Sequence, residues 1–179
     1  MSFHKDGYIV VRKLVSEEVA FEMNGHLISR KDPRFNDGQM NNTPGFYSDD
    51  LMRRIQVKLL PNIEEHIGLN LFKTFSYARL YRKGDVLKIH DDREACEISI
   101  TLDLGGDKWS IWLLDRDENP VKVDLNPGDA LIYRGCELLH WRAKFEGDIH
   151  AQVFFHYVDK SGPYSWAKDD HHKQREEIY

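Results

Sequence analysis

The chain contains 179 residues, of which 41% are hydrophobic, so it can bury one sizeable core and is too short to favour two domains. Its 25 basic and 30 acidic residues give a net charge of -5, and no Lys/Arg-rich block stands out, which argues against a nucleic-acid partner. Two cysteines exclude a disulfide framework. We find neither a signal-peptide core nor a run of roughly 20 apolar residues, so we expect one domain, 1–179, in the cytoplasm and with no membrane partner.

Residues 1–70 are expected to form a strand and two supporting helices. A β-branched and aromatic run at 7–11 predicts the strand. Ser16 is expected to cap a helix that continues to about Arg30, because Glu17 and the acid after it complement the positive end of a helix. The inward face of this helix is expected to contain Ala20, Met23, Leu27 and Ile28.

The polar segment 36–45 predicts a loop. A long loop in a compact domain is either functional, as a substrate lid would be, or a plain surface excursion. A second helix is expected to begin at 48–50, where a serine and two aspartates precede apolar residues at four-residue steps. Pro61 is expected to interrupt or kink this helix and Gly68 to end it.

Residues 71–159 have a different texture, with short alternating or β-branched runs separated by Gly, Pro, Asn and Asp. The predicted strands are 72–81, 86–89, 98–104, 109–114, 121–125, 130–133 and 151–158. Many short strands at regular spacing predict a β-sandwich or a closed barrel. The remaining segment, 160–179, is interpreted as a polar tail, in which His171 and His172 are solvated because adjacent side chains point apart.

Two potential metal ligands, His90 and Asp92, lie one residue apart. Residues two apart on a strand share a face, so these side chains could hold one ion. A lone His-x-Asp pair is a weak signal, but His140 on a later strand would complete the 2-His-1-carboxylate set that suits non-haem Fe(II). Cys96 and Cys136 lie nearby in sequence, and we expect buried packing rather than ligation from them.

The order of these motifs carries a resemblance. The His90-x-Asp92 strand is followed by the Asn-Pro-Gly-Asp turn at 126–129, then by His140, and then by a closing apolar strand at 151–157. Over roughly residues 77–157 the chain resembles the Fe(II)/2-oxoglutarate dioxygenase superfamily, and it is most similar to the prolyl 4-hydroxylase-like branch. The resemblance implies a mainly β fold, a double-stranded β-helix of the jelly-roll or cupin type, with N-terminal helices as outer support.

The resemblance also implies a chemistry. His90, Asp92 and His140 would be the catalytic Fe(II) ligands and would leave positions open for 2-oxoglutarate and dioxygen. Oxidation of 2-oxoglutarate to succinate and CO2 would accompany hydroxylation of an unactivated C–H bond, with ascorbate as a candidate reductant. Analogy of fold slightly favours a peptidyl substrate such as proline, although a small molecule fits the sequence equally well.

The chain departs from the family at the 2-oxoglutarate anchor. The family commonly places Lys or Arg about ten residues after the distal histidine, whereas this chain has His150 there, which is fully charged only below its pKa. His150 and Gln152 share a strand face and are expected to contact the cosubstrate, as is Tyr81. Arg142 and Lys88 are the cationic alternates, because a guanidinium can bind a carboxylate through two hydrogen bonds.

Two other interpretations stay open. The first keeps the barrel and the metal but discards 2-oxoglutarate, as in a cupin-like enzyme or metal-binding module. The second is a non-catalytic β-sandwich interaction domain with incidental histidines, in which Asp92 and Arg93 form only a surface ion pair.

Overall fold

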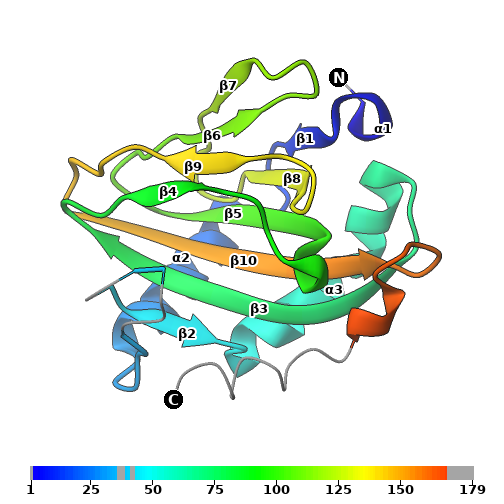
Figure 1. Cartoon of the computed structure of the whole chain (residues 1–179). Coiled ribbons are helices and arrows are strands. Elements are labelled where there is room, and N and C mark those ends of the chain that lie inside the picture. Colours follow the sequence, from blue (N-terminus) through cyan, green and yellow to red (C-terminus); the bar gives the residue numbers. More distant parts are fainter. Residues whose placement is uncertain (1, 36–38, 41–42, 169–179) are drawn as a thin grey trace.

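A computed structural model describes residues 2–35, 39–40 and 43–168. The chain forms two antiparallel sheets, and Figure 1 shows the two longer helices together on one face of the larger sheet. The helices are α1 (Phe3–Asp6), α2 (Glu17–Ser29) and α3 (Asp50–Ile67), with a 3-10 turn at Glu94–Cys96. The strands are β1 (Tyr8–Val11), β2 (Gly45–Tyr47), β3 (Leu71–Arg82), β4 (Leu87–His90), β5 (Ile98–Gly106), β6 (Ile111–Leu114), β7 (Pro120–Val123), β8 (Ala130–Arg134), β9 (His140–Arg142) and β10 (Ile149–Asp159).

The larger sheet has the order β1-β8-β5-β10-β3-β2, and the smaller sheet has the order β4-β9-β6-β7. This arrangement confirms the prediction of a mainly β protein. The N-terminal segment contributes to the large sheet, because β1 pairs with β8 and β2 pairs with β3. Two strands outside the predicted set, β2 and β9, are only three residues long, which is too short for a period-two pattern to be recognised.

The helices follow the predicted capping, with two corrections. Ser16 accepts a hydrogen bond from the backbone N–H of Val19 at 3.3 Å, as expected of an N-cap. Ala20, Met23 and Leu27 are buried, but the prediction for Ile28 is wrong, since this side chain is 58% exposed. Ile28 follows Leu27 directly, and consecutive residues lie about 100° apart around a helix, so only one of them can face the sheet.

Helix α3 begins after Asp49, whose carboxylate accepts from the N–H groups of Leu51 and Met52. The helix continues through Pro61 to Ile67 and ends at the Gly68 cap as predicted, so of the two expectations for Pro61, an interruption or a kink, the interruption is wrong. Pro61 and Val57, whose carbonyl loses its helical donor, both lie on the exposed side of α3. Water can hydrate that carbonyl there, which makes the proline tolerable.

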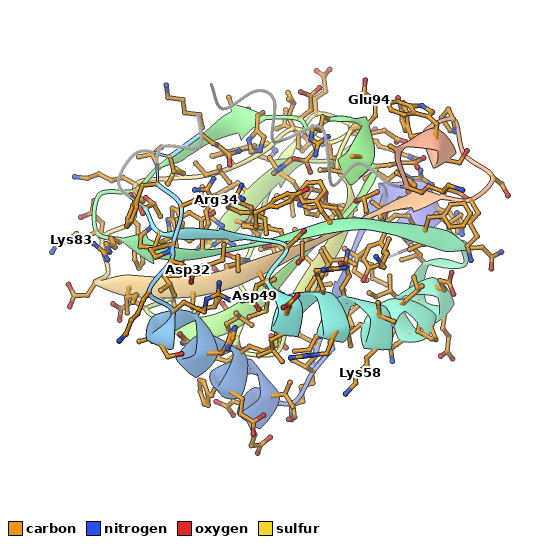
Figure 2. All side chains as sticks on the ribbon, turned by 90° about the horizontal axis from the view of Figure 1, so that it is seen from below. Asp32, Arg34, Asp49, Lys58, Lys83 and Glu94 are labelled. Atoms are coloured by element: carbon orange, nitrogen blue, oxygen red, sulfur yellow. The ribbon has the colours of Figure 1, made fainter. Side chains whose placement is uncertain are left out.

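Asp49 also joins the two helices. Its buried carboxylate lies 2.9 Å from Nε2 of His26 and bonds the guanidinium of Arg30, both at the end of α2. Figure 2 shows Asp49 at the start of α3, beside α2. These contacts tie the start of α3 to the end of α2.

Among the described residues the buried apolar side chains form four clusters, two of which are larger than the others. The largest cluster packs α2 and α3 against the large sheet, and a second cluster fills the space between the sheets near β1, β6 and β8. Several positions of β5 and β10 that face the space between the sheets carry polar side chains, and the buried ones include Ser99, Thr101, Gln152 and His156. Polar side chains inside a barrel indicate where a site could lie.

The C-terminal segment is described as far as Lys168. Ala167 is buried and packs near Phe75 and Val158, whereas Trp166 is 58% exposed. The predictions for His171 and His172 fall outside the described residues. Over the described part of the chain, no helix is long and apolar enough to span a bilayer.

Candidate metal centre

The three predicted metal ligands converge at one end of the space between the sheets. Strands β4 and β9 are antiparallel, and their register places His90 directly opposite His140. Side chains opposite each other on one face are close neighbours, and the two ring centroids are 4.3 Å apart. Asp92 follows β4 and directs Oδ1 to within 3.8 Å of His90 Nε2 and 3.7 Å of His140 Nε2.

Backbone carbonyls fix the tautomer of both histidines. Nδ1 of His90 lies 2.8 Å from the carbonyl oxygen of Lys88, and Nδ1 of His140 lies 2.9 Å from that of Leu138. A carbonyl only accepts, so each Nδ1 carries the proton and each neutral ring keeps a lone pair on Nε2. Both Nε2 atoms therefore face Asp92 in the state that binds metal.

Asp92 is held on both sides. Its backbone N–H donates to the carbonyl of Gly135 at 2.9 Å, and its Oδ2 accepts from the hydroxyl of Ser99 at 2.7 Å. Ser99 also contacts Nδ1 of His156 at 3.0 Å. With Oδ2 occupied in this way, Oδ1 is left for an ion.

A glycine permits this close approach. A Cβ at Gly135 would lie 2.3 Å from the carbonyl oxygen of Cys96, 2.5 Å from Oδ2 of Asp92 and 2.8 Å from Oγ of Ser99. Such distances are too short for a side-chain carbon, so any larger residue must push the carboxylate or the backbone away.

Burial favours the neutral form of the His140 and His156 imidazoles. Burial lowers the pKa of His140, and the Asp92 charge opposes that shift while His90 adds to it. Burial likewise lowers the pKa of His156 to about 4. The thiol of Cys96 has a pKa raised well above its usual value, mainly by burial and next by Asp92.

A second group of possible donors, Asp92, Cys96 and His156, lies adjacent and shares the carboxylate. A buried thiol with a raised pKa stays protonated, and the thiolate is the form that binds metal. The set of His90, Asp92 and His140 is therefore the stronger candidate.

The donor set fits a divalent ion with open coordination positions. The ligand atoms of His90, Asp92 and His140 all lie within 4.8 Å of one another. Bonds of about 2.1 Å at right angles place neighbouring ligand atoms about 3 Å apart, so a small contraction closes the set. Two imidazoles and one carboxylate on one side are the facial arrangement that non-haem Fe(II) uses.

A cavity of about 500 Å³ opens beside the three ligands. Both sheets contribute to its wall, with Leu87 and Ile111 from the small sheet and Tyr81 and Phe154 from the large sheet. Three arginines also line it, namely Arg34, Arg79 and Arg93. The cavity is in the size range of small-molecule sites.

Only one of the expected cosubstrate residues lines this cavity, and that residue is Tyr81. Arg142 donates to the carbonyl of Trp109 and to Oε1 of Gln152. The Nε2 amide group of Gln152 in turn donates to Oγ1 of Thr101. His150 lies 3.1 Å from the same Oε1 of Gln152. His150, Gln152 and Arg142 thus bind one another in the barrel interior and are absent from the cavity wall.

His150, the residue at the position of the family's cation, also lacks a positive charge. Burial, followed by the charge of Arg142, lowers the pKa of His150 to about 3, so this ring is neutral at physiological pH. Lys88, the other cationic alternate, is exposed on β4.

Four contacts near the ligands were not predicted. The amide of Gln39 lies 3.2 Å from Nε2 of His90, and the hydroxyl of Tyr133 lies 3.3 Å from Nε2 of His140. Ser99 and Arg79 complete the set. Arg79 alone carried a usable signal, because it lies two residues before Tyr81 and so shares its face of β3.

Comparisons with known proteins bear on the fold. No family model matches the sequence, and no curated protein matches it. A prolyl-4-hydroxylase from Pseudomonas putida superposes with a TM-score of 0.74 at 14% identity, over 88% of this chain and 95% of that one. HygX from Streptomyces hygroscopicus, solved with nickel and 2-oxoglutarate, gives 0.69 at 14% identity, over 89% and 85% of the chains. The epimerase SnoN, solved with Fe3+, alpha ketoglutarate and nogalamycin RO, gives 0.73 at 14% identity, over 93% and 86%.

These likenesses confirm the resemblance to 2-oxoglutarate oxygenases at the level of the fold. The two packed antiparallel sheets of this chain form the predicted double-stranded β-helix. At 14% identity the likeness carries no substrate or reaction with it.

Proposed function

We propose that this chain is an Fe(II)- and 2-oxoglutarate-dependent dioxygenase. In the proposed reaction a substrate C–H bond, 2-oxoglutarate and O2 are converted to the hydroxylated substrate, succinate and CO2. The observation that carries the proposal is the meeting of two Nε2 lone pairs, from His90 and His140, with Oδ1 of Asp92 at the edge of a cavity of about 500 Å³.

Each residue of the centre has a proposed role. His90, Asp92 and His140 would hold Fe(II), which supplies oxygen activation when bound. Ser99 orients the carboxylate through its 2.7 Å hydrogen bond, as groups behind metal ligands commonly do. Tyr81 is proposed as a cosubstrate contact, because its side chain lines the cavity.

His150, Gln152 and Arg142 are proposed to support the cosubstrate site from behind, since they bind one another away from the cavity wall. The cupin-like interpretation without 2-oxoglutarate rested on the lack of a cation at His150. Three arginines on the cavity wall weaken that objection. The interpretation with incidental histidines does not account for two Nδ1 atoms that are both tied to carbonyls.

Two substrate classes are separable. The resemblance slightly favours a peptidyl residue such as proline. The mouth of the cavity supports a small anionic molecule instead, because the guanidinium of Arg34 lies over the ring of Tyr47 at 5.5 Å and that of Arg93 over Phe75 at 4.9 Å. Figure 2 shows Arg34 on the opposite side of the sheet from α2 and α3, where the cavity lies.

Aromatic faces hold an arginine in place, and the guanidinium fork matches the geometry of a carboxylate or phosphate. The two rings themselves stack, with centroids 5.4 Å apart. Arginines gather at this mouth although the whole chain has a net charge of -5. We therefore propose a small carboxylate or phosphate ester as the first class to test.

The proposal also covers the reductant and the cellular location. Ascorbate is proposed as the reductant that keeps the iron in the ferrous state. A cytoplasmic location is supported by Cys96 and Cys136, which are both free thiols.

The test is anaerobic titration of the apoprotein with Fe(II) and 2-oxoglutarate, followed by succinate assays in air. We expect a weak visible charge-transfer band and basal succinate formation, and loss of both in His90→Ala, Asp92→Ala and His140→Ala. His66→Ala, on the exposed side of α3, is the matched control. Stoichiometric iron retained in all three ligand variants contradicts the proposal.

Succinate formation is then measured with small carboxylates, phosphate esters and prolyl peptides as candidate substrates. If an anion stimulates succinate formation by the wild type but not by Arg93→Gln, the anionic class is supported. Stimulation by a prolyl peptide alone supports the peptidyl class.

A further inference from the structure

We infer that Arg79 binds the distal carboxylate of 2-oxoglutarate, so that the anchor of the cosubstrate lies on β3 and not on the last barrel strand. This inference rests on the proposed function. A carboxylate of the primary substrate would share the same chemistry, and the experiment below separates the two sources.

The first observation is the place of Arg79 relative to the metal ligands. Arg79 is 2% exposed and lines the cavity. One guanidinium nitrogen donates to Oε1 of Gln39 at 3.0 Å, and Nε2 of the same amide lies 3.2 Å from Nε2 of His90. A single side-chain amide therefore spans the distance from the guanidinium to the metal-facing nitrogen, which is a span that one short dicarboxylate can bridge.

The second observation is the strand register. β10 pairs with β3 so that Gln152 lies opposite Arg79 and His150 lies opposite Tyr81. Directly opposed side chains on one face have Cβ atoms about 5 Å apart. Arg79 thus lies one strand over from the segment where the related enzymes carry their cation. A transfer of the anchor to β3 keeps the positive charge in the same part of the barrel.

The third observation concerns the other cations. His150 faces the carbonyl of Asp107 and Oε1 of Gln152, and a neutral ring donates to only one of these oxygens. Arg142 is engaged by Trp109 and Gln152. Neither residue lines the cavity. Among the described arginines that line the cavity, Arg34 and Arg93 are more exposed than Arg79.

The environment of Arg79 suits a carboxylate. Its guanidinium carbon lies 4.8 Å from the ring centroid of Tyr77 and 6.0 Å from that of Tyr81. Cation–π contacts at these distances help to hold the guanidinium in place, and a guanidinium fork suits two parallel hydrogen bonds to a carboxylate. A buried location removes water, which strengthens each charge-assisted bond.

The test compares two ligands that differ only in the distal carboxylate. Fe(II)-loaded protein is titrated anaerobically with 2-oxoglutarate and with 2-oxopentanoate, and binding is followed by the visible band and by calorimetry. We expect Arg79→Gln to weaken 2-oxoglutarate at least tenfold and to leave 2-oxopentanoate unchanged. Arg79→Lys, which keeps the charge and loses the fork, is expected to fall between the wild type and Arg79→Gln.

The controls separate the alternatives. Arg53→Gln removes the same charge from the exposed side of α3 and is expected to leave 2-oxoglutarate affinity within twofold of the wild type. His150→Gln tests the family position. Unchanged 2-oxopentanoate binding in Arg79→Gln shows that the folded site survives the substitution.

Four results overturn the inference. If Arg79→Gln binds 2-oxoglutarate with the affinity of the wild type, Arg79 is not the anchor. Loss of substrate-stimulated turnover in that variant then assigns Arg79 to the primary substrate. Equal weakening of both ligands indicates a structural role. A tenfold loss in His150→Gln with none in Arg79→Gln returns the anchor to β10. Absence of 2-oxoglutarate binding by the wild type overturns the proposed function together with this inference, so the two failures are distinguishable.

Discussion

Ser99 donates its hydroxyl to Oδ2 of Asp92 at 2.7 Å, and Oδ1 of the same carboxylate faces the two histidines. Ser99 lies on β5 in the large sheet, whereas the histidines lie on strands of the small sheet. One hydroxyl therefore ties the metal ligands to the opposite layer of the barrel.

Ser99→Ala is expected to weaken Fe(II) or Mn(II) binding about 10- to 100-fold, the usual loss when a group behind a metal ligand is removed. The carboxylate then rotates freely, and both oxygens compete for the same space. Metal affinity measured by calorimetry checks this result. Ser110→Ala removes an exposed hydroxyl that bonds Asp124 and should leave the affinity unchanged, and equal affinities in the two variants would contradict the prediction.

Gly135→Ala is expected to reduce metal affinity more than tenfold and to destabilise the fold by about 1–3 kcal/mol. The added methyl group meets the carbonyl oxygen of Cys96 at 2.3 Å and Oδ2 of Asp92 at 2.5 Å, so the carboxylate must move. Gly25→Ala is the matched control, because nothing lies within 4 Å of a Cβ there. In the exposed interior of α2 that change should stabilise by about 0.5–1 kcal/mol. Thermal melts and metal titrations report both effects.

The structure brings the three predicted metal ligands together but places His150, Gln152 and Arg142 away from the cavity wall, and this difference has a physical reason. Strand periodicity places His90 and Asp92 on one face and motif order adds His140, and the pairing of β4 with β9 puts the two histidines opposite each other. The same periodicity placed His150 and Gln152 on the inner face. It cannot state whether an inner side chain meets a ligand or another side chain, and here Arg142 from the small sheet engages them.

The parts that were missed share a lack of pattern. Gln39 belongs to a loop without periodicity, and its contact with His90 depends on how that loop returns to the barrel. β2 and β9 exist because neighbouring strands offer unpaired edges to three residues each. Tertiary pairing of this kind overrides weak local signals.

Asp49→Asn is expected to destabilise the protein by about 1–3 kcal/mol at pH 7, because it removes a buried charge partner of His26 and Arg30. Burial raises the pKa of Asp49, but hydrogen bonds from His26 and from the Met52 N–H more than offset it, so the net pKa is lowered. A lowered pKa contributes stability above the unfolded value of about 3.9 that is lost as pH falls through the folded value.

Urea unfolding between pH 3 and pH 7 checks the prediction, and the variant should lose part of the slope at the acidic end. Asp32→Asn is the matched control, because Asp32 also pairs with Arg30 but is exposed. Its stability should equal that of the wild type. A similar loss in both variants contradicts a special role for the buried carboxylate.

Asp103→Asn is expected to stabilise the protein at pH 7 by about 1–3 kcal/mol. Burial raises the pKa of Asp103 to about 6, and the hydrogen bond from the Gly105 N–H only partly opposes it. A raised carboxyl pKa means that the folded state binds more protons than the unfolded state, so stability falls as pH rises from about 4 to about 6. An amide keeps the acceptor for Gly105 without the charge. If the free energies of unfolding of the variant and the wild type change with pH in the same way across this window, the argument is contradicted.

Metal binding should stabilise the native state, because the unfolded chain does not hold His90, Asp92 and His140 together. At a Mn(II) concentration one hundred times the Kd the expected gain is about 2.7 kcal/mol, which corresponds to a rise in Tm of about 5–10 °C for a chain of this size. EDTA should reverse the rise in the wild type, and His140→Ala should show none. A rise retained in His140→Ala would mean that the ion binds elsewhere, for example at the adjacent group of Asp92, Cys96 and His156. His156→Gln then separates the two groups, since it removes a donor of the second set and leaves the three donors of the first in place.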